Sequence, residues 1–257
     1  MTGRRLAIVT GGRRGIGLGI AKALAAADFD IAITGIGDSA GISPVLEELE
    51  ALGAQAAFYR ADLSDVSGHQ ATVEAVVKRF GRIDCLVNNA GMASVVRGDF
   101  LELSPENFDT IVATNLRGTV FFTQAVLRSM LSTDVAARGA RSIMNITSVS
   151  ASLSSPERLD YCVSKAGLSA FSQGLALRLA ETGIGVFEVR PGIIRSEMTA
   201  GVSAKYDALI DGGLVPMKRW GEPSDIGDIV SALASGRFGF ATGSVIQADG
   251  ALSIGRL

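Results

Sequence analysis

TGGRRGIG, residues 10–17, joins a β-rich run at 5–10 to a stretch of helical composition at 15–27. Glycines at such a junction let the backbone turn tightly and come close to a pyrophosphate, and the first N–H groups of the helix stabilise the anion. A glycine-rich turn alone is weak evidence, but its place between a strand and a helix favours a dinucleotide site. No Gly-Lys-Ser/Thr triplet follows, so it is not a Walker loop. The residues expected to hold the dinucleotide here are Gly11, Arg13, Arg14, Gly15, Ile16 and Gly17.

The rest of the chain repeats this alternation of short apolar runs and longer amphipathic ones. Further strands are expected at 31–34, 54–59, 83–87, 141–147, 186–189 and 244–248, and further helices at 45–52, 66–80, twice within 104–131, and from 161 toward 182. The strand candidates are almost continuously apolar, as strands buried on both faces of a parallel sheet are. The pattern predicts an α/β fold: a single-domain Rossmann-type doubly wound parallel sheet over residues 1–257, with helices on both faces. Residues 193–217 break the rhythm, and we interpret this irregular segment as a substrate lid.

The composition excludes several classes of protein. Apolar residues make up 47% of the chain and charged residues 19%, with a mean hydropathy of +0.33, which argues against a disordered chain. Twenty-four basic residues against 26 acidic ones give a net charge of −2, without the basic excess of a nucleic-acid binder. No apolar run reaches the roughly 20 residues of a membrane-spanning helix, so neither nucleic acid nor membrane is an expected partner.

The scarcity of histidine and cysteine excludes more. His69, Cys85 and Cys162 are too scattered for a zinc site, and no Gly-x-Ser-x-Gly elbow accompanies the histidine, so neither a metal centre nor a Ser-His-Asp triad is expected. Two cysteines do not make a disulfide scaffold, and a reducing, cytoplasmic setting fits best. We expect His69 on a solvated helix face and Trp220 in the core or an interface.

The end of the second strand bears on the choice of cofactor. An NAD site usually places Asp or Glu there to bind the ribose hydroxyls. Residues 34–37 read Thr-Gly-Ile-Gly instead, and Asp38 comes late. Arg13 and Arg14 could pair with a 2′-phosphate, although both could equally be solvated surface charges. The sequence therefore favours NADP(H), with NAD(H) as the alternative.

Tyr161 and Lys165 lie one turn apart on a long predicted helix, so they share a face. An ammonium near a phenol stabilises the phenolate and lowers the phenol pKa from about 10 toward neutrality. A tyrosine tuned in this way exchanges a proton with an alcohol or carbonyl oxygen. Tyr-x-x-x-Lys is common by chance, but Ser148 follows the fifth strand, at the edge where α/β proteins bind ligands. Its hydroxyl can bond the substrate oxygen, and Ser150 is the rival serine.

Taken in order, these motifs resemble the short-chain dehydrogenase/reductase family, and most of all its 3-oxoacyl-acyl-carrier-protein reductase-like members. The match covers roughly residues 5–250. Beyond the motifs above it includes Asp62-Leu63 after the third strand, Asn88-Asn89-Ala90-Gly91 after the fourth, Asn115 within the helix pair and Pro191-Gly192 after the sixth strand.

The resemblance implies a role for each matched residue. Tyr161 would be the acid/base, Lys165 would lower its pKa and hold the nicotinamide ribose, and Ser148 would orient the substrate oxygen. Asn115 would anchor a water that links the lysine to solvent. The remaining cofactor contacts would be Asp62 and Leu63 at the adenine, Asn89, Ala90 and Gly91 along the cofactor, and Pro191, Gly192, Ile194 and Ser196 around the nicotinamide. The family usually has threonine where Ser196 stands, and serine keeps the hydroxyl.

The expected activity is hydride transfer between NAD(P) and a small-molecule carbonyl or secondary-alcohol substrate. An acyl thioester, a sugar or polyol, and a small ketone or secondary alcohol all remain open. Its pocket would be walled mainly by apolar residues, among them Met92, Ser94, Val95, Val149, Leu153, Leu159, Ile193 and Met198, with Glu157 and Arg158 near the mouth. The resemblance also implies a homo-oligomer, a tetramer or dimer, built through helices at 108–131 and 159–182 and the last strand. Two alternatives stay open: a non-catalytic dinucleotide-binding redox sensor and a Rossmann-like methyltransferase.

Overall fold

A parallel sheet of seven strands forms the centre of the computed structural model, which describes residues 3–38, 41–132, 139–201 and 203–255. The strand order is β3-β2-β1-β4-β5-β6-β7, and every pairing is parallel. The order reverses between β1 and β4, which is where doubly wound sheets bind their ligands. The strands are β1 (Arg5–Thr10), β2 (Phe29–Gly35), β3 (Ala56–Arg60), β4 (Cys85–Asn88), β5 (Arg141–Ile146), β6 (Ile184–Pro191) and β7 (Val245–Ala248).

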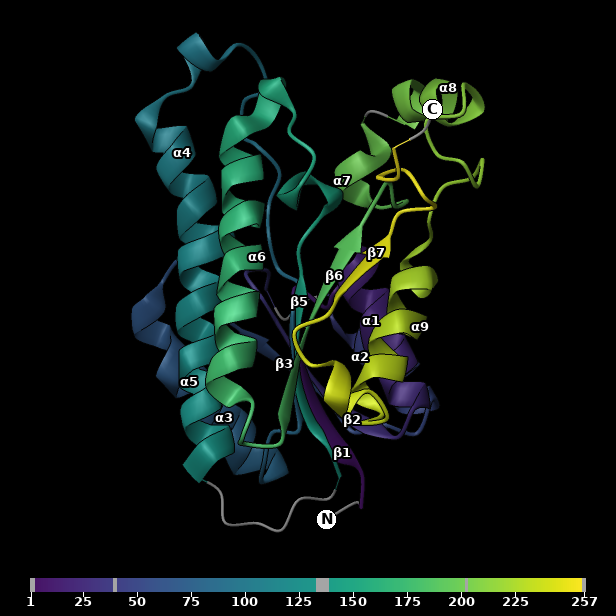
Figure 1. Ribbon diagram of the computed structural model, residues 1–257. Helices are drawn as coiled ribbons and strands as arrows, with labels where there is room; N and C mark the ends of the chain where they lie inside the picture. Colours follow the sequence, from purple (N-terminus) through teal and green to yellow (C-terminus); the bar gives the residue numbers. More distant parts are fainter. Residues whose placement is uncertain (1–2, 39–40, 133–138, 202, 256–257) are drawn as a thin grey trace.

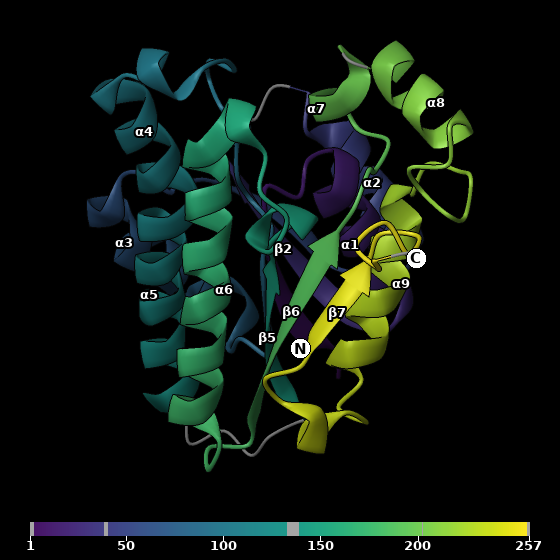
Figure 2. The same cartoon turned by 45° about the horizontal axis from the view of Figure 1, so that its top comes forward.

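Helices cover both faces of the sheet, as the alternation of apolar runs predicts (Figure 1). On one face lie α1 (Gly15–Ala26), α2 (Ser43–Ala51) and α9 (Pro223–Ala234). On the other lie α3 (His69–Phe80), α4 (Pro105–Val112), α5 (Thr119–Ser132) and α6 (Leu159–Leu179). Two short helices, α7 (Glu197–Ala200) and α8 (Ser203–Asp211), stand beyond the carboxyl ends of β6 and β7 (Figure 2).

The period-2 alternation of a strand divides the core between these two layers. Along β1, Ala7 and Val9 belong to the cluster shared with α1 and α9, whereas Leu6 and Ile8 belong to the cluster shared with α3, α5 and α6. All four are at most 2% exposed, which explains why this strand reads as a continuous apolar run. The fold class is confirmed: a single-domain, Rossmann-type sheet covered on both faces.

Three local expectations need correction. The helix α9 was not predicted, although Pro223 in its first turn, a capping box between Glu222 and Asp225 and apolar residues at helical spacing indicate a helix. The segment 193–217, expected to be irregular, contains α7 and α8. His69 is buried rather than solvated, because its Nε2 bonds the Leu63 carbonyl at 3.0 Å and its ring meets Phe122 edge-on.

Trp220 lies in a third cluster with Ile210 and Val215, as expected of a core residue. Within the described part of the chain, no helix is both long and apolar enough to cross a bilayer.

Candidate functional site

The glycine-rich turn lies at the carboxyl end of β1, where its glycines are sterically required. Gly11 and Gly15 have φ angles of +65° and +52°, in the left-handed region that glycine adopts without strain. A side chain on Gly17 would overlap the Gly11 carbonyl and stand 2.5 Å from Asn89 Nδ2. The turn can therefore close only with these glycines.

The start of α1 is suited to an anion. Arg14 occupies the N-cap position, and its side chain makes no capping hydrogen bond to the first turn, which also holds no acidic residue. The leading N–H groups of a helix carry partial positive charge and bind phosphate readily. With the crowded glycines beside it, this helix start fits the pyrophosphate of a dinucleotide.

Thr10 and Asn89 join the ends of β1 and β4 beside that turn. The Thr10 hydroxyl accepts hydrogen bonds from the Asn89 and Ala90 N–H groups, each at 3.0 Å. Asn89 Nδ2 in turn donates to the Thr10 carbonyl at 2.9 Å. These bonds fix the segment 89–91 along one side of the glycine-rich turn, where a bound cofactor would pass.

The two arginines of the turn have different surroundings. Arg13 reaches the end of β2, where its guanidinium carbon lies 5.4 Å from the centre of the Phe58 ring. Its guanidinium is against Gly37, and its Cδ is against Gly35. Arg14 instead pairs with Glu197 of α7. Asp38, the late carboxylate, is exposed and pairs with Arg60 at 3.7 Å. Of these charges, Arg13 is therefore the one placed at the strand end that selects the cofactor.

Asp62 and Leu63, which are predicted to contact the adenine, follow β3. The Asp62 carboxylate is exposed and accepts hydrogen bonds from the N–H and hydroxyl of Ser64, at 2.8 and 2.7 Å. Leu63 is buried, and its carbonyl is hydrogen-bonded to Nε2 of His69. The buried histidine therefore holds the loop that carries this pair.

Tyr161 lies in the first turn of α6 with Ser148 beside it. Asp160, only 1% exposed, accepts hydrogen bonds from the Tyr161 N–H at 2.7 Å and from the Ser94 hydroxyl at 2.6 Å, which fixes the start of the helix. Ser148, two residues after β5, lies close enough for its hydroxyl to interact with the Tyr161 phenol and lower the phenol pKa. Ser148 Oγ also accepts the Ser150 N–H at 3.0 Å, so Ser148, and not its rival, meets the tyrosine.

Lys165 and Asn115 complete this cluster. Lys165 is buried, donates to the Ile146 carbonyl at 3.1 Å, and places Nζ 5.8 Å from the centre of the Tyr161 ring. Asn115 holds the chain after β4, accepting the Met92 N–H at 2.8 Å and donating to the Met92 carbonyl at 2.9 Å. It does so from η3 (Ala113–Gly118), a π-helical segment between α4 and α5. Such segments often mark functional sites.

Burial sets the protonation of the two central groups. Burial raises the pKa of Tyr161, while the hydrogen bond with Ser148 and the charge of Arg158 lower it. Burial also lowers the pKa of Lys165 to about 8, against the attraction of Glu188. The expected net lowering of the Tyr161 pKa by Lys165 is therefore not found, because the loss of solvent around the phenol outweighs the nearby charges.

The segment after β6 faces the glycine-rich turn. A Cβ on Gly192 would lie 2.7 Å from the Asp249 backbone, so only glycine fits at this position. Ser196 caps α7 together with Thr199, and its Cβ lies 3.5 Å from the point where a Gly15 side chain would start. Ile194 is buried. The structure thus brings 191–196 to the same end of the sheet as residues 11–17.

Two residues near this site were not identified as parts of it, and a third, Arg158, was placed only near the mouth of the substrate pocket. Arg158, in η5 (Pro156–Arg158), places its guanidinium carbon 5.5 Å from the centre of the Tyr161 ring. Tyr206, on α8, is close enough to raise the Tyr161 pKa and packs edge-on against Trp220. The other unidentified residue is Asp160, described above. No local pattern reveals Tyr206, because only tertiary packing carries α8 to the start of α6.

Part of the expected substrate wall is exposed. Val95, Leu153 and Met198 are between 39% and 53% exposed, as residues beside an open cleft are. Ser94 is instead 8% exposed, and its hydroxyl is hydrogen-bonded to Asp160. It therefore supports the start of the helix that carries the tyrosine and does not line the substrate pocket.

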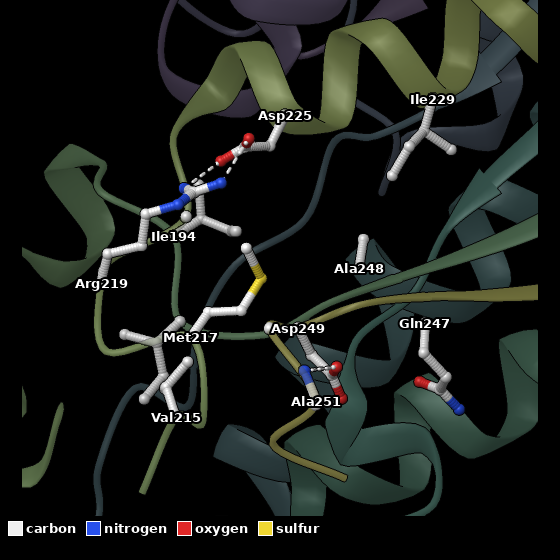
Figure 3. Close-up of a pocket in the computed structure, with 13 residues that line it drawn as sticks. Ile194, Val215, Met217, Arg219, Asp225, Ile229, Gln247, Ala248, Asp249 and Ala251 are labelled. Carbon is white, nitrogen blue, oxygen red and sulfur yellow. Dashed lines mark hydrogen bonds and ion pairs between the residues drawn. The ribbon is translucent and has the colours of Figure 1, made fainter. Parts of the chain in front are cut away.

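A separate cavity of about 330 Å³ lies between the segment 193–194, the chain at 215–221, α9 and the turn after β7. Figure 3 shows Met217 at its centre, with the ion pair between Arg219 and Asp225 along one side. None of Ser148, Tyr161 and Lys165 lines it. Of the predicted cofactor and substrate contacts only Ile193 and Ile194 line it, so this hollow is distinct from the tyrosine cluster.

Comparison with known proteins identifies the family. A family model described as enoyl-(acyl carrier protein) reductase matches residues 11–253. The structure also superposes, with a TM-score of 0.89, on a short-chain type dehydrogenase/reductase from Mycobacterium marinum, which is 29% identical over 98% of this chain and 96% of that one. This chain belongs to the short-chain dehydrogenase/reductase family. It is an NAD(P)-dependent oxidoreductase that acts on CH–OH or carbonyl groups.

Other members of the short-chain dehydrogenase/reductase family are more similar. A 3-oxoacyl-[acyl-carrier protein] reductase from Brucella melitensis, solved in complex with NAD, is 67% identical over 99% of both chains, with a TM-score of 0.95. A 3-oxoacyl-[acyl-carrier-protein] reductase from Staphylococcus epidermidis is 34% identical over 96% of this chain and 98% of its own length.

Proposed function

We propose that Tyr161 is the acid/base of this oxidoreductase. In reduction its hydroxyl gives a proton to the oxygen of the forming alkoxide, and in oxidation its phenolate takes the proton of the alcohol. When bound, the nicotinamide cofactor supplies or accepts the hydride. The observation that carries the proposal is the proximity of Ser148, Tyr161 and Lys165, with the Ser148 hydroxyl close enough to lower the pKa of the phenol and Lys165 Nζ 5.8 Å from the centre of its ring.

The surrounding residues prepare that transfer. Ser148 orients the substrate oxygen toward the phenol, because one hydroxyl can bond both groups. Lys165 lies beneath the tyrosine with a pKa of about 8, so it holds or releases a proton near neutral pH. Asn115 fixes the chain at Met92 against the same cluster and stands next to Lys165 across Gly91. We assign Lys165 and Asn115 to the path by which the tyrosine recovers its proton.

The remaining proposals concern the cofactor, the lid and the assembly. Arg13 at the end of β2 supports NADP(H), whereas the NAD bound to the Brucella relative supports NAD(H) as the alternative. The segment 193–217 would close over the substrate through α7 and α8. A homo-oligomer would use the free edge of β7 and the outer faces of α5 and α6. Two buried free thiols, Cys85 and Cys162, support a cytoplasmic setting.

The two alternative functions have less support. A methyltransferase has no use for the cluster of Ser148, Tyr161 and Lys165, and a redox sensor has no need to keep all three. A titration with NADPH, NADH and S-adenosylmethionine, followed by nicotinamide fluorescence, separates the first alternative. Turnover of a ketone or an alcohol with either nicotinamide cofactor would exclude the redox sensor.

The substitution Tyr161→Phe tests the central proposal. The substitution removes only the hydroxyl, so we expect turnover of ketones and alcohols to disappear. The dissociation constant for NADPH should change by less than about threefold, because the net loss in binding free energy is smaller than that of one hydrogen bond to the cofactor. Lys78→Met, in the last turn of α3 at the opposite end of the sheet, is a control that should keep full activity. Retention of more than a few per cent of the wild-type rate in Tyr161→Phe would remove Tyr161 from the acid/base role.

A further inference from the structure

Arg158 places a positive charge beside the reacting phenol. It precedes Tyr161 by three residues, at the N-cap of α6, and its guanidinium carbon stands 5.5 Å from the centre of the tyrosine ring. The side chain is half-buried. The charge is also close enough to lower the pKa of the Tyr161 hydroxyl, so it can act on a substrate bound at that hydroxyl.

The backbone of Arg158 is firmly held, so its side chain starts from a fixed point. Its N–H donates to the Ser155 carbonyl at 3.1 Å. The preceding carbonyl, that of Glu157, accepts the N–H of Gly98 at 3.1 Å, which ties η5 to the loop after β4. The next turn is pinned through Asp160. Both loops that border the reaction site thus meet at this arginine.

No carboxylate in the described part of the chain lies within ion-pair distance of Arg158. Its neighbour Asp160 is turned inward and bonds Ser94 and the Tyr161 N–H. The arginines on the other side of the site differ, because Arg195 pairs with Glu222 and Arg219 pairs with Asp225. A half-buried guanidinium without a counter-ion is a strong, oriented site for a carboxylate, which it can bind with two parallel hydrogen bonds.

We infer that Arg158 binds an anionic group of the substrate, a carboxylate a few bonds from the carbon that gains or loses the hydride. This inference rests on the proposed function of Tyr161 and narrows its substrate class to small oxo acids and their hydroxy acids. The contact also orients the substrate, because one end is held at Arg158 while the oxygen is held between Ser148 and Tyr161. An acyl thioester carries no such charge beside its carbonyl.

Matched acids and esters test this inference. The panel consists of pyruvate, acetoacetate and 4-oxopentanoate, each compared with its methyl ester, using NADPH and NADH in turn. For at least one pair we expect the wild-type enzyme to reduce the acid with a kcat/KM ten or more times that of the ester. In Arg158→Met, kcat/KM for that acid should fall about 10- to 100-fold, the usual size of a charge-assisted hydrogen bond, and the ester should change by less than about threefold.

The ratio of acid to ester is the decisive readout. Arg158 also lowers the pKa of Tyr161, and the loss of that effect would change acid and ester alike. Arg158→Lys should restore part of the ratio, since it keeps the charge without the planar fork. Lys78→Met, which removes an equal charge at the far end of α3, should leave the ratio unchanged. Butyrate should inhibit reduction of a neutral ketone by the wild-type enzyme competitively, but not by Arg158→Met.

Two results of this comparison would overturn the inference, and a third would overturn it while leaving the proposed function intact. One is an ester turned over as well as its acid throughout the panel, and the other is an equal loss on acid and ester in Arg158→Met. If acetoacetyl thioesters or neutral ketones are reduced while every acid is refused, the anion site is wrong and the proposed function stands. If nothing is reduced with either cofactor while NADPH still binds, the proposed function itself fails.

Discussion

At the scale of single residues, the site contains a buried charge, that of Lys165, which lowers the stability of the folded protein. Lys165 is 5% exposed, and burial lowers its pKa from 10.5 to about 8. The folded protein therefore binds this proton more weakly than the unfolded chain does, and below about pH 8 the buried charge destabilises the fold. Functional groups are often kept at such a cost to stability.

Lys165→Met should consequently stabilise the protein while it abolishes turnover. At pH 7 we expect the free energy of unfolding to rise by about 1–3 kcal/mol, less than the full pKa difference because the Ile146 carbonyl loses its donor. Between pH 8 and 10.5 the wild-type lysine loses its proton in the folded state first, so the advantage of the variant should shrink. Thermal unfolding of both proteins across this range measures it. A variant less stable than wild type at pH 7 would contradict the prediction.

Arg13 supplies a second prediction at this scale, concerning the cofactor. Arg13→Gln removes the guanidinium at the end of β2 and should weaken NADPH binding about 10-fold or more, because a charge-assisted contact to the 2′-phosphate is lost. NADH binding should change less than about threefold. Arg14→Gln, whose charge already pairs with Glu197, is the matched comparison. Equal losses for both cofactors would mean that Arg13 does not read the 2′-phosphate.

At the scale of elements, the contact between α1 and α9 holds the cofactor helix in place. The two helices approach so closely that a Cβ on Gly19 would lie 2.5 Å from the Pro223 carbonyl, and one on Gly227 would lie 2.6 Å from the Gly19 carbonyl. The glycines of α1 therefore serve two ends: Gly15 and Gly17 shape the turn, and Gly19 admits the neighbouring helix.

Gly19→Ala should destabilise the fold by about 1–3 kcal/mol, because the added methyl group meets backbone atoms that cannot move aside. The same change at Gly174 is a control, since a Cβ there meets nothing within 4 Å and alanine favours the helix. Denaturant unfolding distinguishes the two variants. A Gly19→Ala protein as stable as Gly174→Ala would show that α9 can shift to accommodate the added methyl group.

At the scale of the whole molecule, the surface near β7 is apolar. β7 is an edge strand of the sheet and pairs with β6 alone. Next to it, Phe240 is fully exposed and Phe238 is 44% exposed, and Leu177 near the end of α6 is 81% exposed. Exposed apolar groups beside an open strand edge are features of an interface between subunits.

Phe240→Asp should therefore reduce the size of the particle measured by light scattering after size-exclusion chromatography. A carboxylate at the centre of an apolar contact loses its hydration, which weakens association by about 2 kcal/mol or more per interface. Leu101→Asp is the comparison, because Leu101 is 84% exposed in η2 (Phe100–Glu102), away from β7. A Phe240→Asp variant of unchanged mass would exclude this face from the assembly.

The sequence by itself determined the α/β class, the seven strands and the chemistry of the site. Short continuous apolar runs that alternate with amphipathic stretches are typical of strands in a covered parallel sheet, and residues such as Gly17 and the pair Tyr161 and Lys165 act through local spacing, which a sequence displays. The sequence also contains the capping and spacing pattern of α9, from which this helix was not predicted.

Tertiary structure alone decided the rest. It buried His69, raised the pKa of Tyr161, carried Tyr206 to the reaction site and left Arg158 beside the phenol with no carboxylate of the described residues paired to it. Burial and electrostatics depend on which groups surround a side chain from every direction, and those neighbours come from segments far apart in the chain.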